Sequence, residues 1–193
     1  EKLPLDYFKV SVLLLLNTGM RPEEMLAIHG GDIAFDGSEA SINIVSVLDR
    51  DGKTIRSYPK SDAGRRSVPI DAYTAGEVKA WIDIKSNQMK ALGLKPSMSM
   101  LVCGPDVIPR TYQSWLRDWR SFIGAAGFEG IRPYALRHTF ATLNLANGEN
   151  IKTVSVLMGH ASSAYTLDLY AGYVPNTGIG IGSRYMSFLR AAV

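Results

Sequence analysis

The sequence predicts an α+β fold that is mainly helical and carries one small three-stranded antiparallel sheet. Apolar residues recur at helical spacing along most of the chain, whereas residues 32–70 are rich in β-branched residues and turn signals. A length of 193 residues with 46% hydrophobic and 20% charged residues is typical of a soluble globular protein. We therefore expect one domain with a substantial buried core.

Two helices are predicted on either side of Arg21. The first begins at Pro4 and ends at residues 17–19 (NTG). The second is short and has Glu23 and Glu24 in its first turn, where the helix dipole favours anions. An arginine between two helix ends and beside two carboxylates is well placed to be held rigidly. The same pattern also fits an ordinary surface arginine paired with a glutamate.

The β-rich segment is predicted to form a hairpin followed by a third strand. The strands are expected at residues 41–47, 54–58 and 67–70, with Asp51-Gly52 as the first turn. The second turn, KSDAGRR, carries Lys60, Arg65 and Arg66. Three cations on one turn are usually a solvated tip, but against a polyanion such as DNA they become a contact loop.

The rest of the chain is predicted to be helical, apart from loops and a short strand at residues 101–102. Helices are expected at residues 71–92, 109–126, 133–146, 151–158, 163–170 and 183–192. Their inward side chains are expected to include Val78, Trp81, Ile82, Met89, Leu92, Tyr112, Trp115, Leu116, Trp119, Ile123, Leu136, Phe140 and Leu143. Residues 176–183 (NTGIGIGS) match neither a dinucleotide fingerprint nor a P-loop, so we expect a flexible tether there.

Charge and cysteine content narrow the function classes only slightly. The net charge is +3 and the pI is about 9.0, which weakly indicates an anionic partner. The single cysteine, Cys103, excludes an internal disulfide, fits a reducing compartment and is expected to be buried. His29, His138 and His160 lack metal-ligand spacing, so neither a metal nor another cofactor is expected.

Residues 131–173 concentrate basic and phenolic side chains at helix starts and ends. Tyr134 and Arg137 lie three positions apart on one helical face. His160 follows the glycine that ends the next helix, and Tyr170 lies on a third helix. Two short connections can bring these side chains into one cleft. Cationic and phenolic groups are suited to binding a phosphate.

Five motifs occur in a characteristic order. They are TGMRPEEM around Arg21, a turn with Lys60, RPYALRHTFAT around Arg137, LMGH at His160 and TLDLY at Tyr170. This order resembles the catalytic domain of the tyrosine recombinase (phage integrase) family over nearly the whole chain. The LRHTFAT box, followed by MGH and by a tyrosine ten residues after that histidine, is highly specific.

The resemblance implies a role for each matched residue. Tyr170 would attack a DNA phosphodiester, leaving a 3′-phosphotyrosyl link and a free 5′-hydroxyl, and the retained ester removes any need for ATP. Arg21 and Arg137 would clamp the non-bridging oxygens, because a guanidinium matches them in a bidentate way. His160 would donate to the same phosphate, and Lys60 would protonate the leaving 5′-oxygen.

The residues around these five have supporting roles under the same resemblance. Glu24 would orient Arg21 without touching substrate. The box often begins with a histidine where this chain has Tyr134, which can contact phosphate but is a poor proton shuttle near neutrality. His138 and Thr139 would brace the helix. Tyr165 is a rival nucleophile too close to His160 for the family spacing, and Tyr173 is another, three residues beyond Tyr170.

The resemblance also implies partners and domains. Residues 1–175 would be the catalytic domain, without the N-terminal core-binding domain that family members usually carry. Residues 176–193 would be a glycine-rich tether and a helix that docks on a neighbouring protomer in a tetramer on double-stranded DNA, in the bacterial cytoplasm. Three alternatives are a nicking-closing enzyme similar to type IB topoisomerases, a catalytically impaired DNA-binding homologue and, more remotely, an all-helical scaffold.

Overall fold

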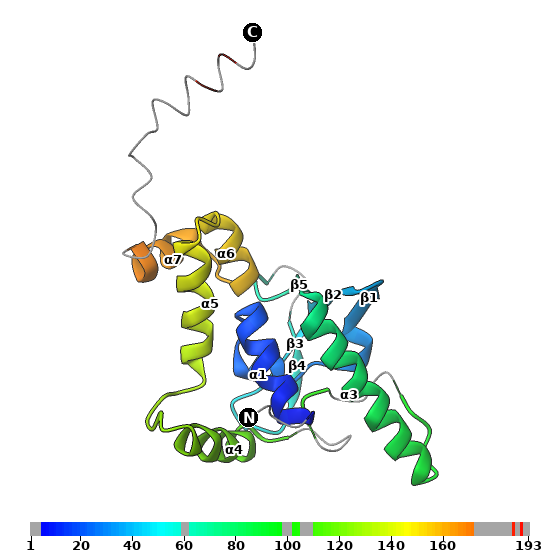
Figure 1. Ribbon diagram of the computed structural model, residues 1–193. Coiled ribbons are helices and arrows are strands. Elements are labelled where there is room, and N and C mark those ends of the chain that lie inside the picture. The colour runs from blue at the N-terminus through cyan, green and yellow to red at the C-terminus, as the bar shows by residue number, and fades with distance from the viewer. Residues whose placement is uncertain are drawn as a thin grey trace.

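The computed structural model describes residues 5–58, 62–97, 102–104 and 110–171, together with Ser187 and Arg190. It has the expected architecture, in which helices surround a small antiparallel sheet (Figure 1). The tether and terminal helix expected at residues 176–193 lie outside the described residues, except for those last two. In the described part of the chain, no helix is both long and apolar enough to cross a membrane.

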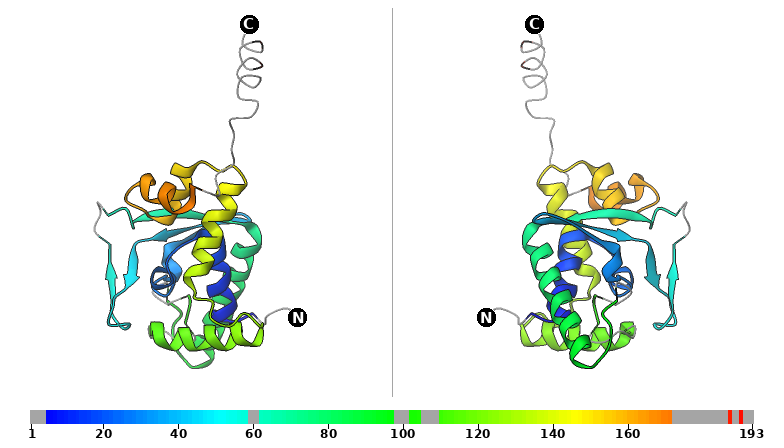
Figure 2. Two further views of the ribbon diagram at one scale, coloured as in Figure 1. Left: turned by 90° about the vertical axis from the view of Figure 1, so that its left-hand side faces the viewer. Right: turned by 90° about the vertical axis from the view of Figure 1, so that its right-hand side faces the viewer.

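Helix α1 (Tyr7–Thr18) lies at the centre of the molecule, between α3, α5 and the sheet (Figures 1 and 2). It begins three residues later than predicted because Asp6 caps it, accepting hydrogen bonds from the backbone N–H groups of Phe8 and Lys9. It ends where predicted, at Gly19, whose φ of 61° is left-handed. The short helix α2 (Pro22–Met25) follows, as expected.

The three-stranded sheet differs from the prediction in its membership. Its order is β1-β2-β5, formed by β1 (Ile33–Asp36), β2 (Glu39–Ile44) and β5 (Arg66–Ile70). Strands β3 (Ser46–Leu48) and β4 (Ile55–Ser57) form a separate ribbon, which stands apart in Figure 2. The predicted strand 41–47 is therefore split in two. The turn around Gly37 pairs β1 with β2, so both edges of β2 are occupied and β4 cannot join it.

Helices α3 (Ala72–Ala91) and α4 (Tyr112–Ala125) form the lower part of the molecule in Figure 1. Trp115 and Trp119 of α4 are fully buried, as predicted. Leu92 is 76% exposed and was wrongly assigned to the core, because α3 ends before it. Lys85 is buried on α3 instead, and its ammonium donates to the carbonyl of Gly104 at 2.7 Å. Val102 is in a turn rather than a strand.

The last three helices form a group beside α1. They are α5 (Tyr134–Ala146), α6 (Ile151–Met158) and α7 (Ser163–Tyr170), close to the predicted bounds. Their shared core contains Phe140 but not Leu143, which is 64% exposed; Leu145 is buried in its place. Because α5 packs along α1 while α6 and α7 both pack on α5, all three helices are positioned relative to α1.

Candidate active site

Two arginines from distant parts of the chain are each held by a helix-ending carbonyl. Arg137 on α5 donates from Nη1 to the carbonyl oxygen of Gly19 at 2.6 Å. Arg21, which precedes α2, donates from Nη2 to the carbonyl oxygen of Gly159 at 3.4 Å. The carbonyl at the end of α1 thus binds Arg137, and the carbonyl at the end of α6 binds Arg21.

The two residues whose carbonyls bind these arginines must be glycine for two reasons. Gly19 and Gly159 have φ values of 61° and 70°, which other residues rarely adopt. A Cβ atom on Gly19 would lie 2.3 Å from Phe140, and one on Gly159 would lie 2.6 Å from Nη1 of Arg66. These glycines therefore let the helices approach closely enough for the carbonyls to reach the arginines.

Glu24 is the centre of the hydrogen bonds behind Arg21. Its carboxylate is fully buried and accepts from the backbone N–H and Nη1 of Arg21, at 2.8 and 2.9 Å. It also accepts from both Nη groups of Arg66, at 3.0 and 2.9 Å, and from the Tyr58 hydroxyl at 2.9 Å. Burial alone would raise the pKa of Glu24, but Arg66 and Arg21 hold it below its usual value.

The two turn arginines suggested as DNA contacts have different environments. Arg66 is buried, and its guanidinium donates to Glu24 and to the carbonyls of Leu157 and Gly64. Its side chain is thus used inside the protein, which does not fit the suggested DNA contact. The sequence does not reveal this buried role, because Arg66 follows Arg65 in what looks like a basic turn. Arg65 is exposed, as a DNA contact requires.

The arginine cluster carries excess positive charge. Arg21 and Arg66 both form ion pairs with Glu24, and Arg137 lies near enough to sense all three charges. Burial and the nearby Arg21 lower the pKa of Arg137 to about 10. Arg137 still carries its charge at neutral pH, but unfavourably, because no carboxylate in the described part of the chain forms an ion pair with it. An anion such as a phosphate would relieve this repulsion.

His160 is positioned as a neutral hydrogen-bond donor. Its Nδ1 lies 2.7 Å from the Thr166 hydroxyl on α7. Burial, followed by the charges of Arg137 and Arg21, lowers the pKa of His160 to about 4. With Thr166 donating to Nδ1, the neutral ring carries its proton on Nε2, which remains free to donate.

Tyr170 lies at the end of α7 with its hydroxyl already engaged. The side chain is only 3% exposed, and its oxygen lies 2.6 Å from Nδ1 of His138 on α5. Burial raises the pKa of Tyr170, while Arg137 partly offsets this rise. His138 was expected only to brace its helix, and no sequence pattern predicts this contact, because it joins residues on two different helices.

One pocket of about 680 Å³ brings these groups together. Its lining includes Arg21, Arg137, His138, His160 and Tyr170. Asp62 and Ala63 also line it. Lys60 lies outside the described residues. Among the described residues, no group of three or more His, Cys, Asp or Glu side chains could hold a metal ion.

Residues 6–174 match the Phage integrase family. The chain belongs to this family. It is 27% identical to a tyrosine recombinase XerC-like protein of Caldanaerobacter subterraneus subsp. tengcongensis, over 86% of this chain and 46% of that protein. It is 25% identical to the ICEBs1 integrase of Bacillus subtilis, over 88% of this chain and 46% of that protein. The chain thus spans about half the length of these relatives.

Solved structures of integrases share the fold. The Tn1549 transposon integrase in complex with circular intermediate DNA aligns with a TM-score of 0.64 and 21% identity, covering 93% of this chain and 59% of that one. The catalytic domain of bacteriophage HP1 integrase aligns with a TM-score of 0.52 and 18% identity, covering 90% and 79% respectively. The mainly helical prediction with a small antiparallel sheet is therefore confirmed.

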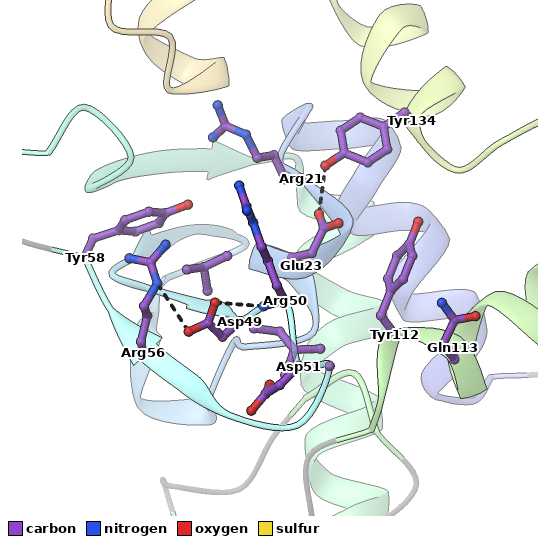
Figure 3. A pocket seen from close by; sticks show the side chains of 13 residues that line it. Arg21, Glu23, Asp49, Arg50, Asp51, Arg56, Tyr58, Tyr112, Gln113 and Tyr134 are labelled. Atoms are coloured by element: carbon purple, nitrogen blue, oxygen red, sulfur yellow. Dashed lines mark hydrogen bonds and ion pairs between the residues drawn. The ribbon is translucent and has the colours of Figure 1, made fainter.

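Tyr134, at the position where the sequence departs from the expected histidine, lines the pocket that holds Arg137 and Tyr170. Its hydroxyl donates to Glu23 at 2.9 Å, as Figure 3 shows. Burial and the Glu23 carboxylate raise its pKa, so it stays protonated near neutrality. Arg21 and Tyr134 also line a neighbouring pocket of about 480 Å³ beside the β3–β4 ribbon (Figure 3).

Proposed function

We propose that this chain is the catalytic part of a site-specific DNA recombinase that cleaves and rejoins strands through a 3′-phosphotyrosyl intermediate. The observation that carries the proposal is the convergence of Arg21, Arg137, His160 and Tyr170 on one pocket. These side chains come from three separate regions of the chain, and their meeting in one pocket supports a shared role in binding and cleaving a phosphodiester. Membership of the phage integrase family supports the same reaction.

The reaction begins with attack by the Tyr170 hydroxyl oxygen on the phosphorus. A new oxygen–phosphorus bond forms, the bond to the 5′-oxygen breaks, and the phosphodiester energy is kept in the tyrosyl ester. Arg21 and Arg137 bind the non-bridging oxygens, where negative charge develops in the transition state. His160 donates from Nε2 to the same group. Rejoining is the reverse reaction with a different 5′-hydroxyl.

Lys60 is proposed to protonate the departing 5′-oxygen. Asp62 and Ala63, shortly after it in sequence, line the pocket, which supports a lysine from this segment acting there. Lys60→Ala should cleave ordinary DNA slowly but recover when the 5′-oxygen is replaced by sulfur, a leaving group that needs no proton. Equal slowing on both substrates would reject the acid role.

The proposed partner is double-stranded DNA, and the proposed context is integration and excision of a mobile element in the bacterial cytoplasm. Relatives that support this context include the ICEBs1 integrase and a transposase of transposon Tn916 from Enterococcus faecalis. We also propose assembly as a tetramer on DNA through residues 176–193.

A covalent-trapping experiment tests the chemistry on a pool of DNA sequences. The chain is incubated with nicked duplexes whose central positions are randomised, so that cleavage releases a short 5′-hydroxyl strand and leaves the adduct trapped. Adducts are separated on a denaturing gel and their DNA is sequenced. Wild type should form an adduct and Tyr170→Phe should not, while Tyr73→Phe, a change on an exposed part of α3, should behave as wild type.

Two results would contradict the proposal. Binding without any wild-type adduct would favour the catalytically impaired DNA-binding homologue. An adduct that survives in Tyr170→Phe but disappears in Tyr165→Phe would show that Tyr165 is the nucleophile. A nicking-closing activity, which uses the same tyrosyl ester, is the second candidate. It predicts relaxation of supercoiled plasmid DNA by the chain alone, without exchanged products.

A further inference from the structure

The Tyr170 hydroxyl lies within hydrogen-bond distance of the imidazole of His138. Nδ1 of His138 lies 2.6 Å from the phenolic oxygen, and the two rings have centroids 5.8 Å apart at a tilt of 54°. When the imidazole carries its proton on Nε2, the phenol donates its hydrogen bond to Nδ1. This is the direction in which a proton must leave Tyr170 when its oxygen attacks phosphorus.

His138 lies one helical turn beyond Tyr134 on α5. Residues four apart share a face of a helix, so both side chains border the same pocket. The Tyr134 phenol donates to Glu23 and is not a base. Of these two side chains, His138 is the one that contacts the Tyr170 oxygen.

The other bases in or near the pocket make different contacts, and Asp62 accepts from the backbone N–H of Gly64. Nδ1 of His160 is occupied by the Thr166 hydroxyl, and the low pKa of His160 makes it a weak base. The Glu24 carboxylate is buried beneath two arginines. Among the residues that the structure describes, His138 is the base in contact with the Tyr170 oxygen.

We propose that His138 is a catalytic residue that accepts the phenolic proton of Tyr170 during strand cleavage. This inference rests on the proposed recombinase function. As the oxygen–phosphorus bond forms, the proton passes to Nδ1 and the neutral imidazole becomes imidazolium. The electron pair of the broken bond leaves with the 5′-oxygen. In the rejoining step the imidazolium returns its proton to the phenol.

Such an acceptor is needed because the phenol does not ionise readily. Burial raises the pKa of Tyr170 above its ordinary value, so phenolate is scarce near neutrality. The His138 side chain is exposed, and its ring can exchange the captured proton with solvent. Imidazole is the side chain that enzymes use most often as a general base.

The test compares adduct formation by wild type, His138→Asn and His138→Ala across pH, using the DNA sequence recovered by covalent trapping. Asparagine keeps a hydrogen-bond acceptor near the Nδ1 position but cannot take up a proton. His29→Asn is the matched control, since His29 lies outside the pocket and faces Asp32. Other charged or titratable groups that line the pocket are Arg21, Asp62, Tyr134, Arg137, His160, Tyr165 and Tyr170.

Three results are expected. Both His138 variants should form the adduct about 10²–10⁴-fold more slowly than wild type near neutral pH, the usual contribution of a general base. The deficit should shrink as the pH rises, because hydroxide then removes the phenolic proton directly. The wild-type rate should fall as the pH drops and His138 becomes protonated, and this acidic limb should be absent in His138→Asn.

The possible results distinguish a failure of the recombinase proposal from a failure of the His138 proposal. No adduct from wild type would reject the recombinase proposal itself. A normal wild-type adduct with His138→Asn at or above the wild-type rate would reject the base, and would show that His138 restrains Tyr170. A deficit that is the same at every pH would also reject it. If the variants unfold, the solvent isotope effect on wild-type adduct formation replaces them; equal rates in light and heavy water would overturn the proposal.

Discussion

Arg137 donates to the carbonyl oxygen of Gly19 at 2.6 Å and so joins α5 to the end of α1. The two residues are 118 positions apart, and the bond forms inside the protein. It aims the arginine at the pocket while occupying a carbonyl that a helix end leaves free. Stability and phosphate binding are therefore coupled at this contact, and several substitutions should affect both.

Gly19→Ala should destabilise the protein strongly. Its Cβ atom would lie 2.3 Å from Phe140, and the left-handed backbone disfavours any side chain. We expect about 1–2 kcal/mol from the backbone and a further ~1–3 kcal/mol from the clash. Denaturant unfolding measures the sum. Gly93→Ala is the control, since Gly93 has a φ of 73° with no atom near its Cβ; equal losses would reject the clash.

Glu24→Gln should leave the buried guanidinium of Arg66 without its charged partner. We expect a loss of about 3–5 kcal/mol in the free energy of unfolding, as for other broken buried ion pairs. Glu77→Gln removes an ion pair with Lys9 that is nearer the surface and should cost far less, because exposed ion pairs contribute little to stability. Similar losses for both variants would contradict the central role of Glu24.

The pH dependence of stability gives Glu24 a second test. Its pKa is depressed in the folded state, so its stabilising contribution is complete above the unfolded pKa of about 4.3. That contribution is lost as the pH falls through the folded value. Wild type should therefore lose more stability than Glu24→Gln between pH 5 and acid. Parallel curves from acid-unfolding titrations would show that Glu24 does not titrate there.

Local signals in the sequence predicted most helix ends and most of the pocket. Gly19 and Gly159 end helices because of their own backbone freedom, and Ser162 caps α7 through its own hydroxyl. The family motifs identified Arg21 and Arg137 because their spacing along the chain is characteristic. Such features depend on residues close in sequence, which sequence patterns record.

Contacts between distant segments could not be predicted in the same way. Arg66 reaches Glu24 across 42 positions, and His138 reaches Tyr170 across 32. The position of β4 outside the sheet depends on β1 occupying the edge of β2. In each case, the outcome is decided by which of several chemically suitable partners lies within reach in the folded chain, and periodicity carries no information about that.

Substitutions of Arg65 and Arg66 should have different effects, one on DNA binding and the other on stability. Arg66→Ala should destabilise the protein by about 3–5 kcal/mol because Glu24 loses its buried partner. Arg65→Ala should leave stability unchanged and, if Arg65 meets a phosphate, reduce the salt dependence of DNA binding by about one unit of slope. Binding isotherms at several salt concentrations, with unfolding curves alongside, measure both effects. If Arg66→Ala instead changed the salt dependence and left stability unchanged, Arg66 would be a DNA contact.

Thr166→Val should impair catalysis through His160. Valine has nearly the same shape but cannot donate to Nδ1, which would be left unsatisfied in a half-buried ring at a cost of about 1 kcal/mol or more. The ring would then be free to place its proton on Nδ1 and lose the Nε2 donor that faces the phosphate. We expect adduct formation to slow by roughly 10- to 100-fold, consistent with that energy. Thr166→Ser keeps the hydroxyl and should restore most of the rate. A Val variant as fast as Ser would show that the Thr166 hydroxyl does not orient His160, and that α7 is held by its apolar contacts alone.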